Sequence, residues 1–296
     1  MTRIAARWHA DAESLTHVRD GTNSVYAVRV AGTRYYLRVT NTRHRTGAQL
    51  EAELDFVEYL GSRGISVARA HRSASGERIE SFPAEPARHA ILFAAVRGRH
   101  FEFFSSDIDR RLFDRWGSAM GAMHAASHAF VPTGPRRPSW DAQDSTTFDR
   151  SGIPGSEMEA WHEHECLTQW LESVPRTPAT WGLIHADFER TNFVIDGRGT
   201  VHIYDFDDAC YHWYAADIAN ALWAFRNAPP CDRAHFLEWF LEGYRRQYTI
   251  GPNVREQLAG FIRVRTLSLF INRLRSARDT EWVRRTRTTF GKPFAW

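Results

Sequence analysis

Three side chains that carry oxygen atoms lie at short spacing in the middle of the chain. Asp187 precedes Asn192 by five residues, and Asp205 follows Asn192 by thirteen. An amide oxygen and a carboxylate are hard donors of the kind that Mg²⁺ accepts, together with waters and phosphates. A second carboxylate on the entering loop could take a proton from a hydroxyl nucleophile. The pattern predicts a metal held by Asn192 and Asp205, and catalysis by Asp187 with Asn192.

A predicted β-hairpin positions these donors. Phe193–Ile195 and Thr200–Tyr204 are rich in apolar and β-branched residues, and an Asp-Gly turn sequence separates them. We expect Ile195 to pair with Thr200. Antiparallel pairing then brings Asn192, at the start of the first strand, to the same end as the carboxylate that follows the second strand. A base beside a metal site suggests phosphoryl transfer.

The order of these residues resembles a known family. The pattern His185-x-Asp187-x4-Asn192, followed by Asp205-Phe and by Asp217-Ile-Ala, is similar to the catalytic and metal-binding loops of the aminoglycoside phosphotransferase family. The run Asp-Phe-Asp-Asp that begins at Asp205 resembles the homoserine kinase type II and stress-response kinase branch. The resemblance implies a protein-kinase-like fold and phosphoryl transfer that depends on ATP and Mg²⁺.

The resemblance also implies a fold class and a division of the chain. The expected fold is α+β and bilobal, with a small antiparallel β-rich lobe that carries one helix and a larger, mainly helical lobe. We expect residues 1–96 to form the nucleotide-binding lobe. Residues 97–296 would form the catalytic and substrate-binding lobe.

Further nucleotide contacts are expected in the amino-terminal lobe. The segment Gly21–Tyr26 resembles the family's phosphate-covering turn, which assigns Asn23 and Ser24 to phosphate binding. Ala94 and Val96 fall where related kinases present backbone groups to adenine. We predict that these four residues contact ATP.

An arginine stands where related kinases carry a phosphate-binding lysine. Arg38 keeps the positive charge and can bind phosphate bidentately, but its planar fork differs from an ammonium group. Glu53 matches the glutamate that pairs with this cation, and Glu51 is the alternative. We expect Arg38 and Glu53 to serve the nucleotide site.

Four neighbouring residues have supporting or open roles. Asp207 is predicted either as a second metal or substrate contact or as a structural residue, and Trp213 as a wall of the acceptor pocket. His185 resembles a histidine that shapes the catalytic loop rather than transferring a proton. Asp217 is expected to order that loop through hydrogen bonds.

A second group of possible metal ligands has unsuitable spacing. His162, His164 and Cys166 are all residue types that bind zinc. On the predicted helix, side chains two residues apart point in different directions and cannot share one ion. We therefore do not expect zinc there, although the run could line the substrate cleft.

The apolar periodicity predicts the elements around these motifs. A hairpin connection is expected at 31–34 and a proline- and glycine-rich loop at 132–156. Breaks between helices are expected at Pro229-Pro230 and Gly251-Pro252. The predicted strands are 25–30, 35–39 and 90–96, and the predicted helices are 49–60, 112–130, 157–174 and several from 215 onward.

Composition places the chain among ordinary globular proteins. Of 296 residues, 43% are hydrophobic and 25% charged, and no apolar run reaches the roughly 18–20 residues of a membrane span. The three cysteines form no disulfide framework. The start of the chain has no secretory signal, so we expect a cytoplasmic protein without membrane association.

The carboxy-terminal part is basic. From Pro230 onward the chain has 13 basic and 6 acidic residues, a charge of +7, whereas the whole chain carries +3. Arginines on solvated helix faces explain this without nucleic acid. A basic carboxy-terminal part suits a neutral or anionic small-molecule acceptor, such as an amino alcohol, sugar or related metabolite, better than a polycationic antibiotic.

Several alternatives remain open from the sequence alone. The acceptor hydroxyl could belong to a protein serine or threonine, as in stress-response kinases. The chain could also be a nucleotide-binding regulator with weak activity, for which Arg38 is the main argument. A hydrolase that uses Asp187 and Asp205 as paired carboxylates fits poorly with Asn192. The oligomeric state and the preference for ATP or GTP are not predicted.

Overall fold

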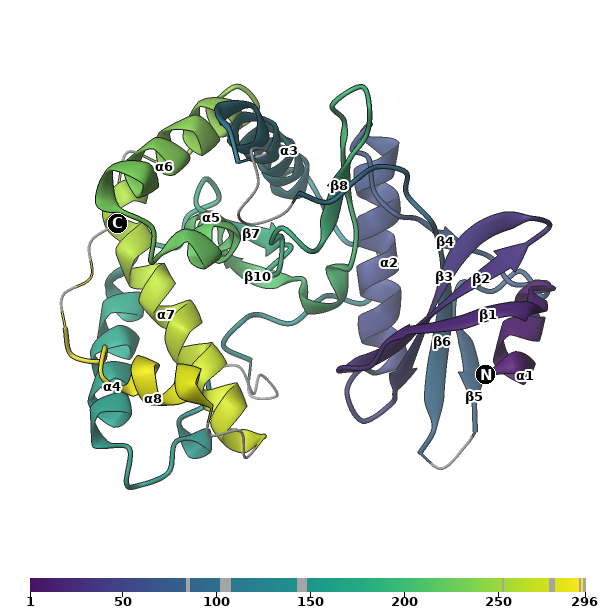
Figure 1. The fold of residues 1–296 in the computed structure, drawn as a ribbon, viewed down its shortest axis with the longest axis horizontal. Helices are drawn as coiled ribbons and strands as arrows, with labels where there is room; N and C mark the ends of the chain where they lie inside the picture. The colour runs from purple at the N-terminus through teal and green to yellow at the C-terminus, as the bar shows by residue number, and fades with distance from the viewer. Residues whose placement is uncertain are drawn as a thin grey trace. The chain divides into compact units, whose positions relative to one another are not determined.

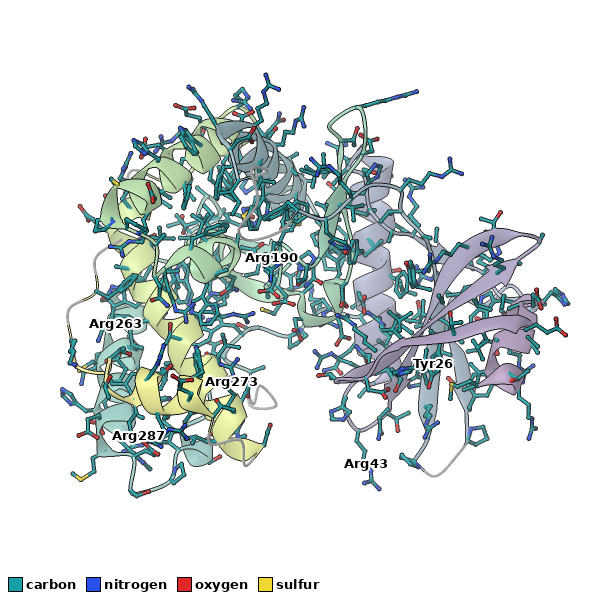
Figure 2. All side chains as sticks on the ribbon, in the orientation of Figure 1. Tyr26, Arg43, Arg190, Arg263, Arg273 and Arg287 are labelled. Atoms are coloured by element: carbon teal, nitrogen blue, oxygen red, sulfur yellow. The ribbon has the colours of Figure 1, made fainter. Side chains whose placement is uncertain are left out.

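The computed structural model (Figures 1 and 2) forms two compact units from interleaved segments. Unit 1 holds residues 1–100, 130–137 and 192–207, and unit 2 holds 101–129, 138–191 and 208–296. The α+β class is confirmed by an antiparallel sheet in the amino-terminal part and helices in the carboxy-terminal part, whereas the lobe boundary at residue 96 stays a prediction. The structure describes residues 1–83, 86–101, 108–142, 148–251, 253–276, 280–292 and 294.

Unit 1 is built on an antiparallel sheet of six strands. Its strands run in the order β1-β2-β3-β6-β4, and β5 pairs with β6 (Figure 1). The predicted strands at 25–30, 35–39 and 90–96 are confirmed as β2, β3 and β6, with β6 ending earlier, at Ala94. The strands are β1 (Asp11–Arg19), β2 (Asn23–Val30), β3 (Thr33–Asn41), β4 (Ala70–His71), β5 (Glu80–Phe82) and β6 (Arg88–Ala94).

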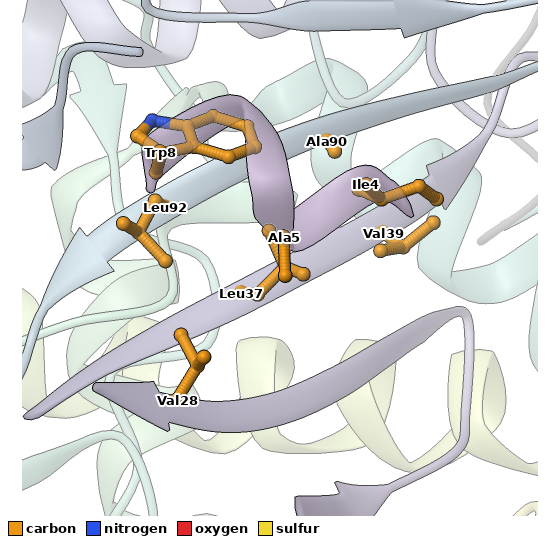
Figure 3. Packing of buried hydrophobic residues seen from close by; sticks show 8 residues of the cluster. All are labelled: Ile4, Ala5, Trp8, Val28, Leu37, Val39, Ala90 and Leu92. Carbon is orange, nitrogen blue, oxygen red and sulfur yellow. The ribbon is translucent and has the colours of Figure 1, made fainter. Parts of the chain in front are cut away.

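One face of this sheet is covered by the start of the chain. The short helix α1 (Thr2–Ala5) and the 3-10 turn η1 (Ala6–Trp8) pack on β2, β3 and β6 (Figure 3). Trp8 is 2% exposed, and its indole N–H donates to the carbonyl of His71 at 2.8 Å. Burying each large apolar side chain here contributes about 1.5–3 kcal/mol. The cluster contains Ile4, Ala5, Trp8, Val28, Leu37, Val39, Ala90 and Leu92.

The β2–β3 connection is tighter than predicted. Val30 pairs with Thr33, so the turn is the two residues Ala31 and Gly32 rather than residues 31–34. Both have positive φ, 48° and 79°, which matches the twist of a two-residue hairpin. The register then places Arg38 opposite Val25.

The helix predicted at 49–60 is confirmed as α2 (Gly47–Ser62). Thr46 and Gln49 form a capping box at its start, each side chain accepting from the other's backbone N–H. Its buried face contains Leu50, Ala52, Glu53, Leu54, Phe56, Val57 and Leu60. One charged residue therefore lies within an otherwise apolar helix face.

A second hairpin in unit 1 consists of β8 (Phe193–Ile195) and β9 (Val201–Ile203). Its existence is confirmed, but the predicted register was wrong by one residue, because Ile195 pairs with Val201 rather than with Thr200. The reason is the Asp196 carboxylate, which accepts from the backbone N–H groups of Arg198 and Thr200 and closes a longer turn. Asn192 consequently lies opposite Tyr204, whose N–H donates to the Asn192 carbonyl at 3.1 Å.

Unit 2 is mainly helical. The helices predicted at 112–130, 157–174 and beyond 215 are confirmed, while the β7–β10 ladder was not predicted. Part of the loop predicted at 132–156, residues 143–147, lies outside the described residues, as does Pro252. The elements are α3 (Arg110–His128), η2 (Arg150–Gly152), α4 (Met158–Ser173), β7 (Trp181–Ile184), β10 (Cys210–Trp213), α5 (Tyr214–Leu222), η4 (Trp223–Phe225), α6 (Pro230–Arg245), α7 (Val254–Arg275) and α8 (Glu281–Arg287).

Two glycines allow α3 and α6 to pack closely. A Cβ at Gly117 would lie 1.9 Å from the Phe240 carbonyl oxygen, and a Cβ at Gly243 would lie 1.9 Å from the Asp114 carbonyl oxygen. The two backbones therefore touch at these positions. None of the helices within the described ranges is long and apolar enough to span a bilayer.

A buried histidine makes the stability of unit 2 depend on pH. Burial lowers the pKa of His212 to about 3. Its Nδ1 accepts from the Trp213 N–H at 2.9 Å, and its ring stacks on Trp140. Because the unfolded chain takes up this proton near pH 6.5 and the folded chain does not, the free energy of unfolding falls as the pH drops below 6.5.

We predict that His212→Phe reduces this acid sensitivity. Between pH 7.5 and 5.0 the wild type should lose about 2 kcal/mol more unfolding free energy than the variant, as measured by urea titration at both pH values. His235→Phe, at an exposed site that also stacks on a tryptophan, is the matched control and should behave as the wild type. Equal losses in the wild type and His212→Phe would contradict the assignment.

Candidate active site

A buried ion pair joins the sheet and the helix of unit 1. Arg38 donates from both terminal nitrogens to Glu53, at 2.8 and 2.6 Å, and the two residues are 5% and 0% exposed. This confirms the expected partner of Arg38. The alternative, Glu51, instead forms an ion pair with Arg78.

The local sequence explains how these two charges meet. In β3, Leu37 and Val39 point into the core under α1, so Arg38 between them points to the opposite face of the sheet. Its guanidinium carbon lies 4.9 Å from the centre of the Phe93 ring. Glu53 comes from the buried face of α2. Strand alternation and helix periodicity thus bring both residues to one interior position.

Burial and charge act in opposite directions on this pair. Burial alone would lower the pKa of Arg38, but the negative charges of Glu53 and Asp207 raise it above its usual range. Burial raises the pKa of Glu53, and the two guanidinium N–H groups oppose that shift. Arg38 is therefore a permanent cation inside unit 1.

Asp207 lies near the same cation. Its carboxylate accepts from the Asn23 side chain at 3.1 Å and forms an ion pair with Arg45 at 3.3 Å. One oxygen lies 4.0 Å from Arg38. Burial would raise the pKa of Asp207, but these arginines, together with Arg137, lower it. Asp207 is thus an ionised carboxylate, 5% exposed, and Asn23 is held in place by it.

Asp205 presents a second carboxylate to Arg38. One of its oxygens lies 3.8 Å from the Arg38 guanidinium, and the other forms an ion pair with Arg19. Its backbone has φ of 68°, a left-handed conformation that costs of order 1–3 kcal/mol and is often found at functional sites. The hairpin register places Asn192 across from Tyr204, the residue before Asp205.

Asn192, Asp205 and Asp207 are residue types that bind a hard divalent cation, and the metal site there stays a prediction. Asn192, Asp205 and Asp207 supply one amide and two carboxylates, and Mg²⁺ is usually held by one or two carboxylates with waters and phosphates. Across the described ranges, no three His, Cys, Asp or Glu side chains are grouped to hold a metal by themselves.

The other residues predicted to contact nucleotide also lie in unit 1. Ser24 donates its hydroxyl to Asp20 at 2.6 Å. The Ala94 N–H donates to the Arg69 carbonyl at 2.9 Å, so this donor is already engaged. Val96 follows the end of β6. Their contacts with ATP stay predictions.

In unit 2, the predicted base Asp187 lies on the loop after β7. Its carboxylate is 25% exposed and accepts from Arg265 of α7 at 2.7 Å. The Asp187 N–H donates to Nδ1 of His185 at 3.2 Å. The histidine therefore shapes the loop backbone, as expected.

The buried Asp217 side chain fixes the backbone of the loop that precedes Asp187. Its side chain accepts from the backbone N–H groups of His185 and Ala186, at 3.1 and 2.9 Å, and it contacts the His124 ring at 3.0 Å. Burial would raise the pKa of Asp217, but the hydrogen bond and charge of His124 lower it. Ala186 is left-handed, with φ of 66°, and Asn220 donates to its carbonyl. The predicted ordering role of Asp217 is confirmed.

Trp213 lies in the interior of unit 2. It is 1% exposed, donates its indole N–H to the Pro175 carbonyl, and packs edge-on against Trp181 at 4.7 Å. Arg176 stacks over the same ring. These contacts make Trp213 part of the packed interior of unit 2. Its role in an acceptor pocket stays a prediction.

The His162, His164 and Cys166 run behaves as its spacing predicts. All three lie on α4, where His164 is buried and the other two are exposed. Nε2 of His164 contacts the Phe148 carbonyl, while His162 contacts the Cys166 sulfur one turn away. The buried and exposed members thus face different surroundings.

Sequence reasoning missed four arginines that contact the predicted site residues. Arg19, Arg45 and Arg137 contact Asp205 or Asp207, and Arg265 contacts Asp187. Each comes from a segment far away in the sequence. No local motif marks them, and the large number of arginines in this chain hides them.

Solved structures share this fold along almost the whole chain. An amicoumacin kinase, solved in complex with AMP-PNP, Ca²⁺ and Ami, superposes with a TM-score of 0.91 at 24% identity, covering 99% of this chain and 93% of the other. A microcompartment-associated aminopropanol kinase superposes with a TM-score of 0.81 at 23% identity, covering 97% and 92%. These similarities show the kinase-like fold.

The sequence comparison defines the family. The profile of the phosphotransferase enzyme family matches residues 15–260, so the chain belongs to that family and is a phosphotransferase. It is 26% identical over 280 residues to amicoumacin kinase of Bacillus subtilis, covering 91% of this chain and 82% of that protein. It is also 26% identical over 265 residues to homoserine kinase of Methylobacillus flagellatus, covering 86% and 76%.

We predict that Glu53→Gln destabilises the protein by about 3 kcal/mol, because it leaves the buried Arg38 cation incompletely paired. Glu51→Gln is the matched control on the same helix. Its partner Arg78 keeps Asp55, so its loss should stay within about 1 kcal/mol. Urea titration of both variants measures their free energies of unfolding. Equal losses in the two variants would contradict the prediction that the buried pair contributes more to stability than the surface pair.

Proposed function

We propose that this protein is an ATP- and Mg²⁺-dependent kinase that transfers the γ-phosphate to a hydroxyl of a small molecule. The observation that carries the proposal is the Asp187 loop, whose backbone is fixed by buried Asp217 while its carboxylate stays partly exposed. Such a pre-positioned base is what phosphoryl transfer to an alcohol requires. The amicoumacin, aminopropanol and homoserine kinases among its relatives have names that point to small acceptors.

Unit 1 is assigned to the nucleotide. Arg38 neutralises phosphate charge, and its two hydrogen bonds to Glu53 keep its position fixed. Asn23 and Ser24 cover the phosphates, while Ala94 and Val96 receive the adenine. Asn192 and Asp205 hold the divalent ion, with Asp207 nearby. The bound ion supplies further neutralisation of the phosphate oxygens.

Unit 2 is assigned to the acceptor. Asp187 orients the acceptor hydroxyl and takes its proton as the new bond to phosphorus forms and the bond to ADP breaks. Arg265 holds one carboxylate oxygen, which fixes the direction of the other. Because ATP is an intracellular metabolite, the proposal places the enzyme in the cytoplasm.

We predict that Asp187→Ala lowers the rate of phosphate transfer by about 10²–10⁴-fold and leaves ATP affinity unchanged. The assay is transfer of labelled γ-phosphate to a panel of sugars, amino alcohols, hydroxylated antibiotics and a generic protein. Asp114→Asn, at a surface ion pair of α3, is the control and should keep full activity.

Two results of this assay would contradict the proposal. ATP binding without transfer to any acceptor would favour the regulator. Transfer only to the protein substrate would favour a serine or threonine protein kinase.

A further inference from the structure

A β-bulge changes the direction of the last side chain of β1, which is an edge strand of the sheet (Figure 1). His17 of this strand pairs with Tyr26 of β2. Two residues later Arg19 pairs with Val25, so β1 contains one extra residue at this point. A slip of one residue turns the following side chains to the other face of a sheet. Without the bulge, Arg19 would share the face of Tyr26, which packs against the hydrophobic cluster that contains α1.

The bulge places Arg19 in the same cross-strand row as Arg38. Val25 of β2 pairs with Arg19 on one side and with Arg38 of β3 on the other. Directly paired residues of an antiparallel sheet have their side chains on the same face. Two strand spacings, roughly 9–10 Å, separate the backbones of the two arginines. Both side chains therefore project from the face of the sheet that lies opposite α1.

The two guanidinium groups share one carboxylate. One oxygen of Asp205 forms an ion pair with Arg19, and the other lies 3.8 Å from the Arg38 guanidinium. All three residues belong to unit 1. A guanidinium binds carboxylate and phosphate oxygens through the same planar fork of N–H groups. Two forks that converge on one carboxylate are therefore also placed to bind a chain of phosphates, which offers more anionic oxygens.

Arg19 is the member of this pair that can leave the carboxylate. The Arg38 guanidinium is buried and donates two hydrogen bonds to Glu53. The Arg19 side chain is 55% exposed and lies at the end of an edge strand. Because ion pairs of exposed side chains contribute little to stability, the exchange of one anionic partner for another costs little. Asp205 is thus a replaceable partner of Arg19.

We propose that Arg19 and Arg38 form a two-arginine phosphate clamp, in which Asp205 holds Arg19 in position until a polyphosphate replaces it. Asp205 then binds the divalent ion, and Arg19 moves to the phosphate oxygens, so that each charge keeps an opposite partner. This inference rests on the proposed binding of ATP and its metal ion in unit 1. It adds a phosphate-binding residue, Arg19, that lies outside every motif of the sequence and precedes the predicted phosphate-covering turn by two residues.

Inorganic tripolyphosphate tests the clamp without metal or nucleotide. Isothermal titration calorimetry in EDTA compares the wild type, Asp205→Asn, and the double variant that combines Asp205→Asn with Arg19→Gln. Asp205→Asn releases Arg19 and removes a negative charge, so it should bind tripolyphosphate about tenfold or more tighter than the wild type. The double variant should bind it about tenfold or more weakly than Asp205→Asn, because the released guanidinium is missing.

The exchange of partners also predicts opposite effects of Arg19→Gln on ion and nucleotide. Mn²⁺ titrated alone and followed by electron paramagnetic resonance should bind this variant about two- to fivefold tighter than the wild type, because the cation that competes for Asp205 is gone. AMP-PNP with Mg²⁺ should bind it about fivefold or more weakly, because a charged contact to phosphate is lost. A general loss of structure would weaken both.

Arg29→Gln is the matched control for the loss of one positive charge from this sheet. Arg29 is an exposed residue of β2, and its guanidinium donates to the Gly32 carbonyl at 2.8 Å. Alone, the control should leave the affinities for Mn²⁺ and AMP-PNP unchanged. Combined with Asp205→Asn, it should keep the gain in affinity for tripolyphosphate. Circular dichroism of each variant verifies the fold.

The outcomes separate the clamp from the proposed function. Equal tripolyphosphate affinity of Asp205→Asn and the double variant would overturn the clamp, and so would effects of the same sign on Mn²⁺ and AMP-PNP. If the clamp fails while the wild type transfers phosphate and Asp187→Ala does not, the kinase stands without Arg19. If the tripolyphosphate results hold but no acceptor is phosphorylated, the clamp stands and the kinase proposal fails.

Discussion

The organisation of unit 1 depends on the buried Arg38 cation, because an unpaired charge in the interior would be strongly destabilising. Arg38 is buried on the inner face of the sheet, and only a bidentate carboxylate can balance it there, which requires Glu53 to lie on the apolar face of α2. The same guanidinium attracts Asp205 and Asp207 to within about 4 Å. One buried charge therefore orders the helix, the sheet and the two carboxylates that follow the second hairpin.

In unit 2 a buried negative charge, that of Asp217, has the corresponding role of ordering the chain around it. Asp217 is a buried anion that accepts two backbone N–H groups from the loop before Asp187 and contacts His124 behind it. These bonds stabilise the left-handed backbone of Ala186, a conformation that an alanine rarely adopts. The interior of the unit thereby fixes the backbone, while the Asp187 carboxylate stays partly exposed and close to Arg265. A rigid backbone beside an accessible side chain is the arrangement that general-base catalysis needs.

The sequence predicted those features that local patterns encode. Alternation and helical periodicity indicated β2, β3 and α2, and motif spacing indicated the loop of Asp187. The pairing of Arg38 with Glu53 was expected from the resemblance to related kinases. The predicted hairpin register was wrong by one residue because the Asp196 side chain accepts from the N–H groups of Arg198 and Thr200 and thereby closes a longer turn. The arginines that contact Asp187, Asp205 and Asp207 were missed because a contact between distant segments leaves no periodic signal in the sequence. Arg265, for example, cannot be distinguished by sequence from the other arginines of the helices.

The central claim is that Arg38, Asn192 and Asp205 bind the phosphates and the divalent ion of ATP. A crystal structure of the protein with AMP-PNP and Mg²⁺ tests it most directly. The account predicts phosphate oxygens in contact with Arg38, the ion bound to the Asn192 amide oxygen and the Asp205 carboxylate, and Arg19 displaced from that carboxylate. A nucleotide bound away from Arg38, or an ion held without Asn192 and Asp205, would contradict it.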